Sequence, residues 1–308
     1  MRIVQRRGWE IPERLVTPEA LVLHRRGALA GAAALAAASG APARADTAPV
    51  PRNPKYTVDR ALTSEKWATT YNNYYEFSED KDLWRDAQAL HQRPWAIQLA
   101  GMLAKPRSID IDDLLKQVQL EERVYRHRCV EAWAMTVPWT GFPLSALVKL
   151  AEPLGSARYV VFETIQDKSM PGLSASFYPW PYIEGATMDE AMNDLAFLVT
   201  GLYGKPLPPQ NGGPIRLALP WKYGFKSAKA IAKITFTDQR PKTFWEALQP
   251  SEYGFWANVN PEVPHPRWSQ ATERLLGSDE RVPTRLFNGY AEFVGSLYEN
   301  RKAEKLFM

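Results

Sequence analysis

The chain has 308 residues, of which 45% are hydrophobic and 12% aromatic, which is enough apolar material for one large core or two small ones. Its 38 Lys and Arg residues outnumber its 34 Asp and Glu residues, but residues 1–45 hold seven of these cations and three of these anions, so 31 of each remain after residue 45. A chain without surplus positive charge gives no support to nucleic-acid binding, because that function neutralises phosphates with Lys and Arg.

Residues 1–45 are typical of an export signal. The twin arginine Arg25-Arg26 precedes an Ala-rich apolar run at 27–41, and Ala43-Arg44-Ala45 places small residues where a signal peptidase cleaves. The run is shorter than the roughly 20 residues that a membrane-spanning helix needs. We therefore predict export to the periplasm by the twin-arginine route, with cleavage after Ala45. A general secretory signal with an incidental arginine pair is the alternative.

The rest of the chain divides into a lead-in and a main domain. Residues 46–70 begin with a Pro-rich stretch and predict an extended N-terminal lead-in. The main domain is expected over 71–308. The sequence contains no internal repeat and no later apolar run long enough to span a membrane.

Short strands are predicted by alternating apolar and polar residues, and short helices by helical spacing and capping residues. In chain order they are a strand over 95–99, a turn over 101–106, a helix over 110–118 capped by Ser108 or Asp110, a helix over 143–151, a strand over 159–164, a helix over 188–195 capped by Thr187, and strands over 197–202, 215–219 and 230–236. Because these elements lack the regular alternation of a doubly wound sheet, we predict an α+β fold with mixed sheets in a single large domain. The absence of Gly-x-Gly-x-x-Gly and of a phosphate loop ending in Gly-Lys-Ser/Thr disfavours the common nucleotide enzymes.

Cys129 is the only cysteine, so in an oxidising compartment it has no disulfide partner within its own chain. Arg126 and Arg128 flank it, and nearby positive charge stabilises a thiolate, which is both the nucleophile and the metal ligand. Three interpretations stay open on these residues alone: an inert buried thiol, a nucleophile paired with His127, or a ligand to a soft metal that an organic cofactor otherwise holds. A zinc site of the usual kind is disfavoured, because the four histidines are scattered singly.

Two further segments carry groups that can grip a cofactor. Residues 205–214 form a Pro-rich loop with Gly212-Gly213, where backbone amides can approach a ligand closely. Residues 221–229 offer amides, a hydroxyl and lysines that can hold a phosphate. The ordinary alternatives are a hairpin turn and a solvated lysine cluster.

Seven strings of sequence together resemble one family. They are YNNYYEF at 71–77, RCVEAW at 128–133, VPW at 137–139, PPQNGGP at 208–214, PWKYGFK at 220–226, YGFWANVNP at 253–261 and HPRWSQA at 265–271. The chain resembles the bacterial, exported members of the sulfite-oxidase-fold molybdoenzyme family, most of all the catalytic subunits that reduce methionine sulfoxide in periplasmic proteins. The resemblance runs from about Tyr71 through Gly277. His127, Gly213 and a short 169–182 stretch depart from the family pattern, and we expect that stretch to border the substrate opening.

The resemblance implies a cofactor and the residues that hold it. Cys129 would supply a thiolate to molybdenum. Contacts to the pterin are implied for Asn72, Tyr75, Glu76, Thr164, Asn211, Arg216, Ser227, Ala228 and Lys229, the last three matching the phosphate-binding stretch of the family. The implied cofactor is molybdenum–molybdopterin without an attached nucleotide, one per chain. The implied electron donor is a haem-containing membrane subunit.

The implied reaction is reduction of methionine sulfoxide residues in periplasmic proteins by oxygen-atom transfer. We hypothesise that Glu131, two residues after Cys129, lies close to the metal and takes part in proton delivery or water placement; the alternative is a salt bridge to Arg126 or Arg128. Trp133, Tyr253 and Trp256 are candidates for an aromatic rim, or else for core packing. The competing functions are sulfite oxidation or small-molecule S- or N-oxide reduction on the same fold, and an exported binding protein with an inert Cys129.

Overall fold

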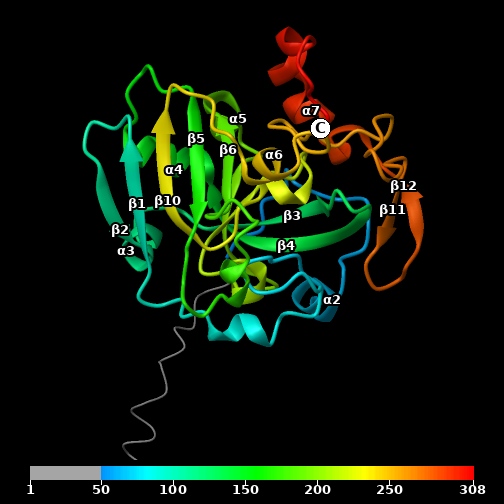
Figure 1. The fold of residues 1–308 in the computed structure, drawn as a ribbon, viewed down its shortest axis with the longest axis horizontal. Coiled ribbons are helices and arrows are strands. Elements are labelled where there is room, and N and C mark those ends of the chain that lie inside the picture. Colours follow the sequence, from blue (N-terminus) through cyan, green and yellow to red (C-terminus); the bar gives the residue numbers. More distant parts are fainter. Residues whose placement is uncertain (1–49) are drawn as a thin grey trace, which may run out of the picture. The chain divides into compact units, whose positions relative to one another are not determined.

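Two β-sheets form the framework of the chain. The computed structural model describes residues 50–308, so the predicted signal sequence, its arginine pair and the cleavage after Ala45 lie outside the described residues. Figure 1 shows β1, β10, β5 and β6 side by side, while β3 and β4 run across their direction. Both sheets mix parallel and antiparallel pairs, which confirms the predicted α+β class with mixed sheets.

The first sheet has five strands in the order β2-β1-β10-β5-β6. β1 and β10 are parallel neighbours, and the other pairs are antiparallel. The strands predicted at 95–99, 159–164 and 230–236 are confirmed; in β5, buried and part-buried residues alternate as the sequence pattern requires. The strands are β1 (Ala96–Gly101), β2 (Arg107–Asp110), β5 (Tyr159–Thr164), β6 (Ile183–Thr187) and β10 (Ile231–Thr237).

The second sheet has seven strands, with β3 paired to β4 and β9 paired to β7 beside the path β12-β11-β4-β7-β8. β3 and β4 are antiparallel, from Glu121 opposite Gly141 to Arg128 opposite Ala134. The strands predicted at 197–202 and 215–219 are confirmed, the second in shorter form. The strands are β3 (Glu121–Arg128), β4 (Trp133–Pro143), β7 (Phe197–Leu202), β8 (Lys205–Pro206), β9 (Arg216–Ala218), β11 (Thr272–Leu275) and β12 (Arg281–Pro283).

Short helices connect and flank the strands. Thr187 caps α5 in a reciprocal arrangement: its hydroxyl accepts from the Glu190 N–H, and the Glu190 carboxylate accepts from the Thr187 N–H. Asp110, rather than Ser108, caps α3, which ends at Leu115, earlier than predicted. The α-helices are α2 (Glu65–Thr70), α3 (Ile111–Leu115), α4 (Leu144–Ala151), α5 (Met188–Met192), α6 (Phe244–Leu248) and α7 (Ala291–Val294). The 3-10 helices are η3 (Asp86–Ala89), η4 (Pro171–Ser174), η5 (Pro209–Asn211), η6 (Gly224–Lys226), η7 (Leu286–Gly289) and η8 (Gly295–Arg301).

No helix within residues 50–308 combines the length and the apolar character needed to cross a membrane.

The described part of the predicted lead-in lies against the second sheet. The Asn53 N–H donates to the Glu122 carbonyl over 2.8 Å, and the Thr63 N–H donates to the Thr136 carbonyl over 2.9 Å. Tyr56 is buried beside Tyr125, and residues 65–70 form helix α2. The segment is therefore anchored along β3 and β4.

Candidate active site

Cys129 lies in the tight turn that joins the two longest strands. β3 ends at Arg128 and β4 begins at Trp133, and the Cys129 N–H donates to the Trp133 carbonyl over 2.9 Å. The Ala132 N–H donates back to the Cys129 carbonyl over 3.1 Å, and Ala132 takes a positive φ of 62° to close the turn. These backbone hydrogen bonds fix the turn, and Cys129 lies buried in it with only 5% of the residue exposed.

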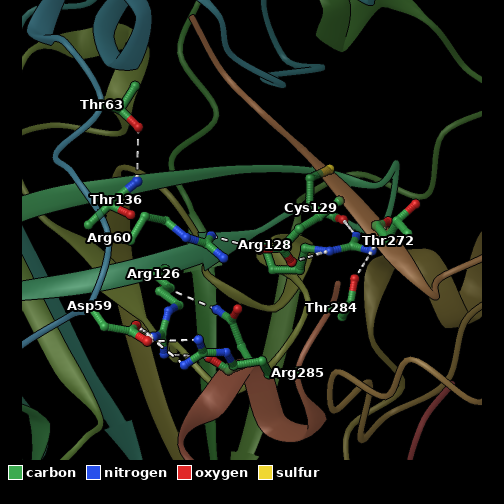
Figure 2. Close-up of polar contacts among 12 residues, drawn as sticks. Asp59, Arg60, Thr63, Arg126, Arg128, Cys129, Thr136, Thr272, Thr284 and Arg285 are labelled. Carbon is green, nitrogen blue, oxygen red and sulfur yellow. Dashed lines mark hydrogen bonds and ion pairs between the residues drawn. The ribbon is translucent and has the colours of Figure 1, made fainter. Parts of the chain in front are cut away.

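Arg128 holds this turn from the side opposite the sulfur (Figure 2). Its guanidinium donates to the Cys129 carbonyl, to Glu273 over 2.9 Å and to the Gln270 side chain over 2.8 Å. Gln270 in turn donates to the Val130 carbonyl over 2.8 Å. The buried fork of Arg128 thus fixes the backbone of Cys129 directly and that of Val130 through Gln270.

Arg128 acts on the pKa of Cys129 in the predicted direction and lowers it, but the effect of burial is larger. Arg128 is paired with Glu273 and Arg126 with Asp59, so their charges are already compensated. Burial, reinforced by the Glu131 carboxylate, raises the pKa of Cys129 to about 12. A protein-only environment therefore keeps this sulfur protonated, and a bound cation must replace the proton for it to act as a thiolate ligand.

The sulfur opens into a cavity of about 790 Å³, a volume that includes the space open to solvent at its mouth. Both sheets and the loops between them contribute to the wall, which carries both polar and aromatic side chains. The lining residues are Asn72, Asn73, Tyr74, Tyr75, Glu76, His127, Cys129, Val130, Glu131, Trp133, Met135, Thr164, Tyr182, Arg216, Gly224, Phe225, Ser227, Lys229, Trp245 and Tyr253.

Two buried cations give one side of the cavity a positive charge. Lys229 donates to the Asn73 carbonyl over 2.7 Å, and Arg216 donates to the carbonyls of Asn211, Leu217 and Ser227. Among residues 50–308, neither cation forms an ion pair with a carboxylate. Burial lowers the pKa of Lys229 to about 7 and that of Arg216 to about 10. Buried cations without counter-ions are costly, and they favour an anionic ligand such as a phosphate.

The other lysines of the 221–229 segment are used differently. Lys222 pairs with Glu190 and Lys226 with Glu184, each over 2.5 Å and each fully buried. Both pairs lie in the interior and stabilise the loop rather than the cavity. Of the three lysines in this segment, Lys229 is the one that reaches the cavity wall.

Glu131 lies beside the sulfur and is the centre of a small polar cluster. Its carboxylate is 3.8 Å from the Cys129 sulfur and accepts from Lys81 over 2.9 Å, from Asn73 over 3.1 Å and from the Trp133 indole over 3.0 Å. Burial alone would raise the pKa of Glu131, but these hydrogen bonds outweigh it and hold the pKa below its ordinary value. The salt-bridge partner of Glu131 is Lys81, so the predicted alternative of Arg126 or Arg128 is wrong.

Several buried polar atoms around the cavity have no partner within the described chain. They are Asn72 Nδ2, Asn73 Oδ1 and the Tyr74 hydroxyl, and each belongs to a lining residue. Leaving such groups unpaired costs about 1–3 kcal/mol each. Together with one thiol and two unpaired cations, they fit a large polar, anionic cofactor with a metal at the sulfur. The residues present are therefore compatible with a molybdopterin.

The structure brings all but two of the predicted site residues to this cavity. Asn211 and Ala228 are fully buried behind the wall, where the Asn211 side chain donates to the Ala68 carbonyl over 2.9 Å and the Ala228 carbonyl accepts from the Leu217 N–H over 2.9 Å. Trp133 and Tyr253 of the predicted rim also line it. Trp256 does not: its indole donates to Glu304 over 2.7 Å and its ring packs on Tyr298, so it belongs to the core.

Other lining residues were not singled out by the sequence. Asn73 lines the cavity and holds Glu131 together with Lys81, which lies outside the lining, and Trp245 and Tyr182 add aromatic rings to the wall. Asn73 lies inside the YNNYYEF string at 71–77, and this string could have indicated that Asn73 belongs to the site. Nothing near Lys81 in the sequence indicates that its amine reaches Glu131.

His127 shares the cavity with Cys129, as expected for alternating positions near the end of a strand. No hydrogen bond joins the two side chains in the described structure. Burial and the nearby Arg216 and Lys229 cations lower the pKa of His127 well below its ordinary value. A neutral imidazole without a hydrogen bond to the thiol gives little support to a Cys–His nucleophile.

Known proteins with similar sequences indicate the family of this chain. The family described as "Oxidoreductase molybdopterin binding domain" matches residues 85–245. The protein-methionine-sulfoxide reductase catalytic subunit MsrP of Burkholderia mallei is 50% identical, over 97% of this chain and 96% of the relative. The protein of the same name from Ralstonia nicotianae is 48% identical, over 98% and 97%. Among solved structures, the sulfane dehydrogenase SoxCD of Paracoccus pantotrophus aligns with a TM-score of 0.45 at 17% identity, over 59% of this chain and 47% of that one.

Near-complete coverage at this level of identity leaves no part of the described domain unaccounted for. The chain is a molybdopterin-binding oxidoreductase and belongs to the family of protein-methionine-sulfoxide reductase catalytic subunits.

Proposed function

We propose that this protein reduces methionine sulfoxide residues in other proteins to methionine, using molybdenum–molybdopterin without an attached nucleotide, one per chain. The observation that carries the proposal is the single thiol of Cys129 at a cavity whose wall also holds two cations, Lys229 and Arg216, without carboxylate partners. The name and near-complete match of the relatives support the choice of substrate.

In this proposal the residues divide into three groups by chemistry. Cys129 ligates the metal. Lys229, Arg216 and Ser227, with the backbone at Ala228, hold the phosphate, and Asn211 braces Arg216 through its carbonyl over 3.1 Å. Asn72, Tyr75, Glu76 and Thr164 contact the pterin. When bound, the cofactor supplies a two-electron centre that accepts an oxygen atom from a sulfoxide.

The reaction consumes two electrons and two protons for each sulfoxide, and it yields one thioether and one water. Glu131 and Asn73 flank the sulfur, and Asn73 Nδ2 lies 3.5 Å from it. We assign them to orienting the S=O group and the water derived from it. The Lys81 ammonium, which is partly exposed to solvent, keeps the Glu131 carboxylate ionised and in place.

The polar cluster also favours a neutral substrate over sulfite. Sulfite is a dianion when fully deprotonated, and close to the sulfur it would meet the ionised Glu131 carboxylate, whose charge Lys81 compensates in part. A sulfoxide is neutral and avoids the repulsion between the two anions. Small S- or N-oxides meet the same requirement, so they are the closest competing substrates.

The proposal also includes a partner and a location. A single cysteine makes the Cys-x-x-Cys-His motif of covalent haem attachment impossible in this chain. We therefore assign electron supply to a haem-containing membrane subunit and the substrates to oxidised periplasmic proteins. Export of the folded chain by the twin-arginine route after uptake of the cofactor is consistent with the Arg25-Arg26 pair.

The test is elemental analysis combined with a turnover assay. Protein expressed with cofactor supply is expected to contain about one molybdenum per chain and to reduce a methionine sulfoxide peptide with an artificial electron donor, with little oxidation of sulfite. A Cys129→Ser variant should lose nearly all activity and change the visible absorption of the metal centre. A metal-free protein would support the inert-thiol alternative, and full activity in the Ser variant would refute the ligand role of Cys129.

A further inference from the structure

The aromatic side chain of Phe177 is exposed to solvent near the cavity. Phe177 is 65% exposed, more than any other large hydrophobic side chain in residues 50–308. It lies in the loop between β5 and β6, the 169–182 stretch that the sequence associates with the substrate opening. Single exposed apolar residues are common, so the exposure of Phe177 alone does not indicate a function. The ring contacts that connect Phe177 to the cavity do.

A continuous run of rings leads from Phe177 to the cavity wall. Phe177 packs on Tyr178 with ring centroids 4.3 Å apart, and Tyr178 contacts Tyr75 at 5.9 Å. Tyr75 contacts Trp245 at 5.1 Å, and Trp245 contacts Tyr253 at 5.0 Å. Tyr75, Trp245 and Tyr253 all line the cavity. We call these five residues the aromatic lip; two ring contacts separate its exposed end from the wall.

The loop that presents Phe177 is held in place on the domain. The Gly172 N–H donates to the Glu76 carbonyl over 2.8 Å, and a Cβ at Gly172 would lie 2.1 Å from the Tyr75 carbonyl oxygen, so only glycine fits this approach. Tyr178 donates to Glu79 over 2.9 Å, and the Trp180 indole donates to the Ala175 carbonyl over 3.1 Å. A surface fixed before binding loses little conformational entropy when it binds.

We propose that the aromatic lip binds an apolar residue that flanks the oxidised methionine in an extended segment of the substrate protein. The inference rests on the proposed function. When a methionyl sulfoxide side chain enters the cavity, the residues next to it in the chain must lie over the rim, because extended residues advance about 3.3 Å each. The rim there is aromatic and exposed, and it therefore favours an apolar or aromatic neighbour. Phe177 is a specificity-determining residue in this scheme and does not touch the reacting atoms.

The test compares three substrates with the molybdenum-loaded enzyme. They are free methionine sulfoxide, a pentapeptide with the sulfoxide flanked by glycines, and the same peptide with phenylalanine on both sides. The wild type should show the lowest KM for the Phe-flanked peptide. In Phe177→Ala that KM should rise about 5- to 10-fold, the scale of one lost aromatic contact with its buried area. The kcat, and both constants for free methionine sulfoxide, should stay unchanged.

Two further variants make the result specific. Phe177→Trp should restore the preference, because it restores an exposed ring. Leu154→Ala removes an apolar side chain that is 47% exposed and does not line the cavity, and it should have no effect. The reduced Phe-flanked peptide, labelled with a fluorophore, should show the same loss of binding to Phe177→Ala by anisotropy, without any turnover.

Different results would contradict the aromatic lip and the proposed function. A wild type that reduces free methionine sulfoxide without preferring the Phe-flanked peptide would overturn the aromatic lip alone. So would a Phe177→Ala variant that keeps the wild-type KM for that peptide, or one that loses activity equally on all three substrates. A molybdenum-loaded wild type that reduces no sulfoxide would overturn the proposed function and this inference with it.

Discussion

Identical side chains have different roles in the 221–229 segment because their neighbours differ. Lys222 and Lys226 each face a buried glutamate, whereas Lys229 faces the cavity and a backbone carbonyl. A buried ion pair tolerates no loss of one partner, since the other charge is then left without compensation. A buried cation without a partner is the opposite case, because removing its charge relieves a cost.

Lys229→Met should therefore separate cofactor binding from stability. Loss of a charge-assisted bond to a phosphate, worth about 1.5–3 kcal/mol, should lower the molybdenum content of the purified protein roughly 10- to 100-fold at limiting cofactor. The cofactor-free variant should be at least as resistant to urea as the parent. Lys226→Met is the contrasting variant and should lose about 3–5 kcal/mol of stability. Undiminished molybdenum in Lys229→Met would show that the phosphate is held elsewhere.

Glu76 should give the cofactor-free protein a characteristic pH dependence. Burial raises its pKa from 4.5 to about 7, and a backbone hydrogen bond and Lys229 offset this only in part. The folded state therefore keeps this proton to a higher pH than the unfolded state does. The resulting stabilisation, on the order of 3 kcal/mol, is complete below pH 4.5 and is lost as the pH rises to about 7.

Glu76→Gln should remove this slope. Urea unfolding of the cofactor-free protein at pH values on either side of this range should show a smaller decrease in the variant than in the parent. An equal decrease in both proteins would mean that Glu76 titrates normally.

Sequence reasoning found the chemistry of the site better than its geometry. Cys129 stood out because it is unique, and the long strings marked most of the cavity wall. The ion pair between Lys81 and Glu131 joins residues fifty positions apart, and local sequence carries no sign of it. The pairing of Arg126 with Asp59 and of Arg128 with Glu273 was likewise not visible in the local sequence, and neither was the burial that outweighs Arg128 and raises the pKa of the thiol.

Elements with one buried face or a strong cap were predicted well. β5 alternates buried and part-buried residues, and Thr187 begins α5 with its capping partner Glu190 three residues later. β3 and β4 were missed as strands. β4 is buried along almost its whole length on both faces, so it shows no alternation, and β3 contains three arginines whose burial depends on distant partners.

The cap of α5 provides a test at this scale. Thr187→Ala removes the hydroxyl that accepts from the Glu190 N–H and should lower the free energy of unfolding by about 1 kcal/mol. Ser64→Ala is the matched control, because Ser64 begins α2 without a side-chain cap bond and its loss should cost almost nothing. Equal effects of the two substitutions in chemical denaturation would contradict the assigned role of the capping box.

The whole domain depends on contacts between segments that are far apart in the chain. β1 and β10 are parallel neighbours with Gln98 opposite Lys233, and α2 contacts η5 through Ala68 and Asn211. Sequence patterns reveal strands but not which strands pair over such separations, so the mixed class was predictable and the strand order was not. The same applies to the lead-in, whose contacts with β3 become visible only in the fold.

A truncated chain that starts at Tyr71 should therefore be less stable than one that starts at Asp46. The truncation removes the burial of Tyr56 and leaves Arg126 without Asp59, a loss of roughly 3 kcal/mol or more. The melting temperature should fall by about 2–4 °C for each kcal/mol. Thermal unfolding of the two proteins measures this, and equal melting temperatures would mean that the anchored segment contributes nothing.

The buried, protonated sulfur of Cys129 should be oxidised only slowly. The thiolate is the form that attacks peroxides and disulfides, and a pKa raised to about 12 leaves very little of it at neutral pH in the cofactor-free protein. Cofactor-free chains can therefore accumulate without forming intermolecular disulfides through Cys129 and without oxidation of this thiol to a sulfonic acid. Stocks of the cofactor-free protein should consequently keep the Cys129 thiol intact over long storage in air.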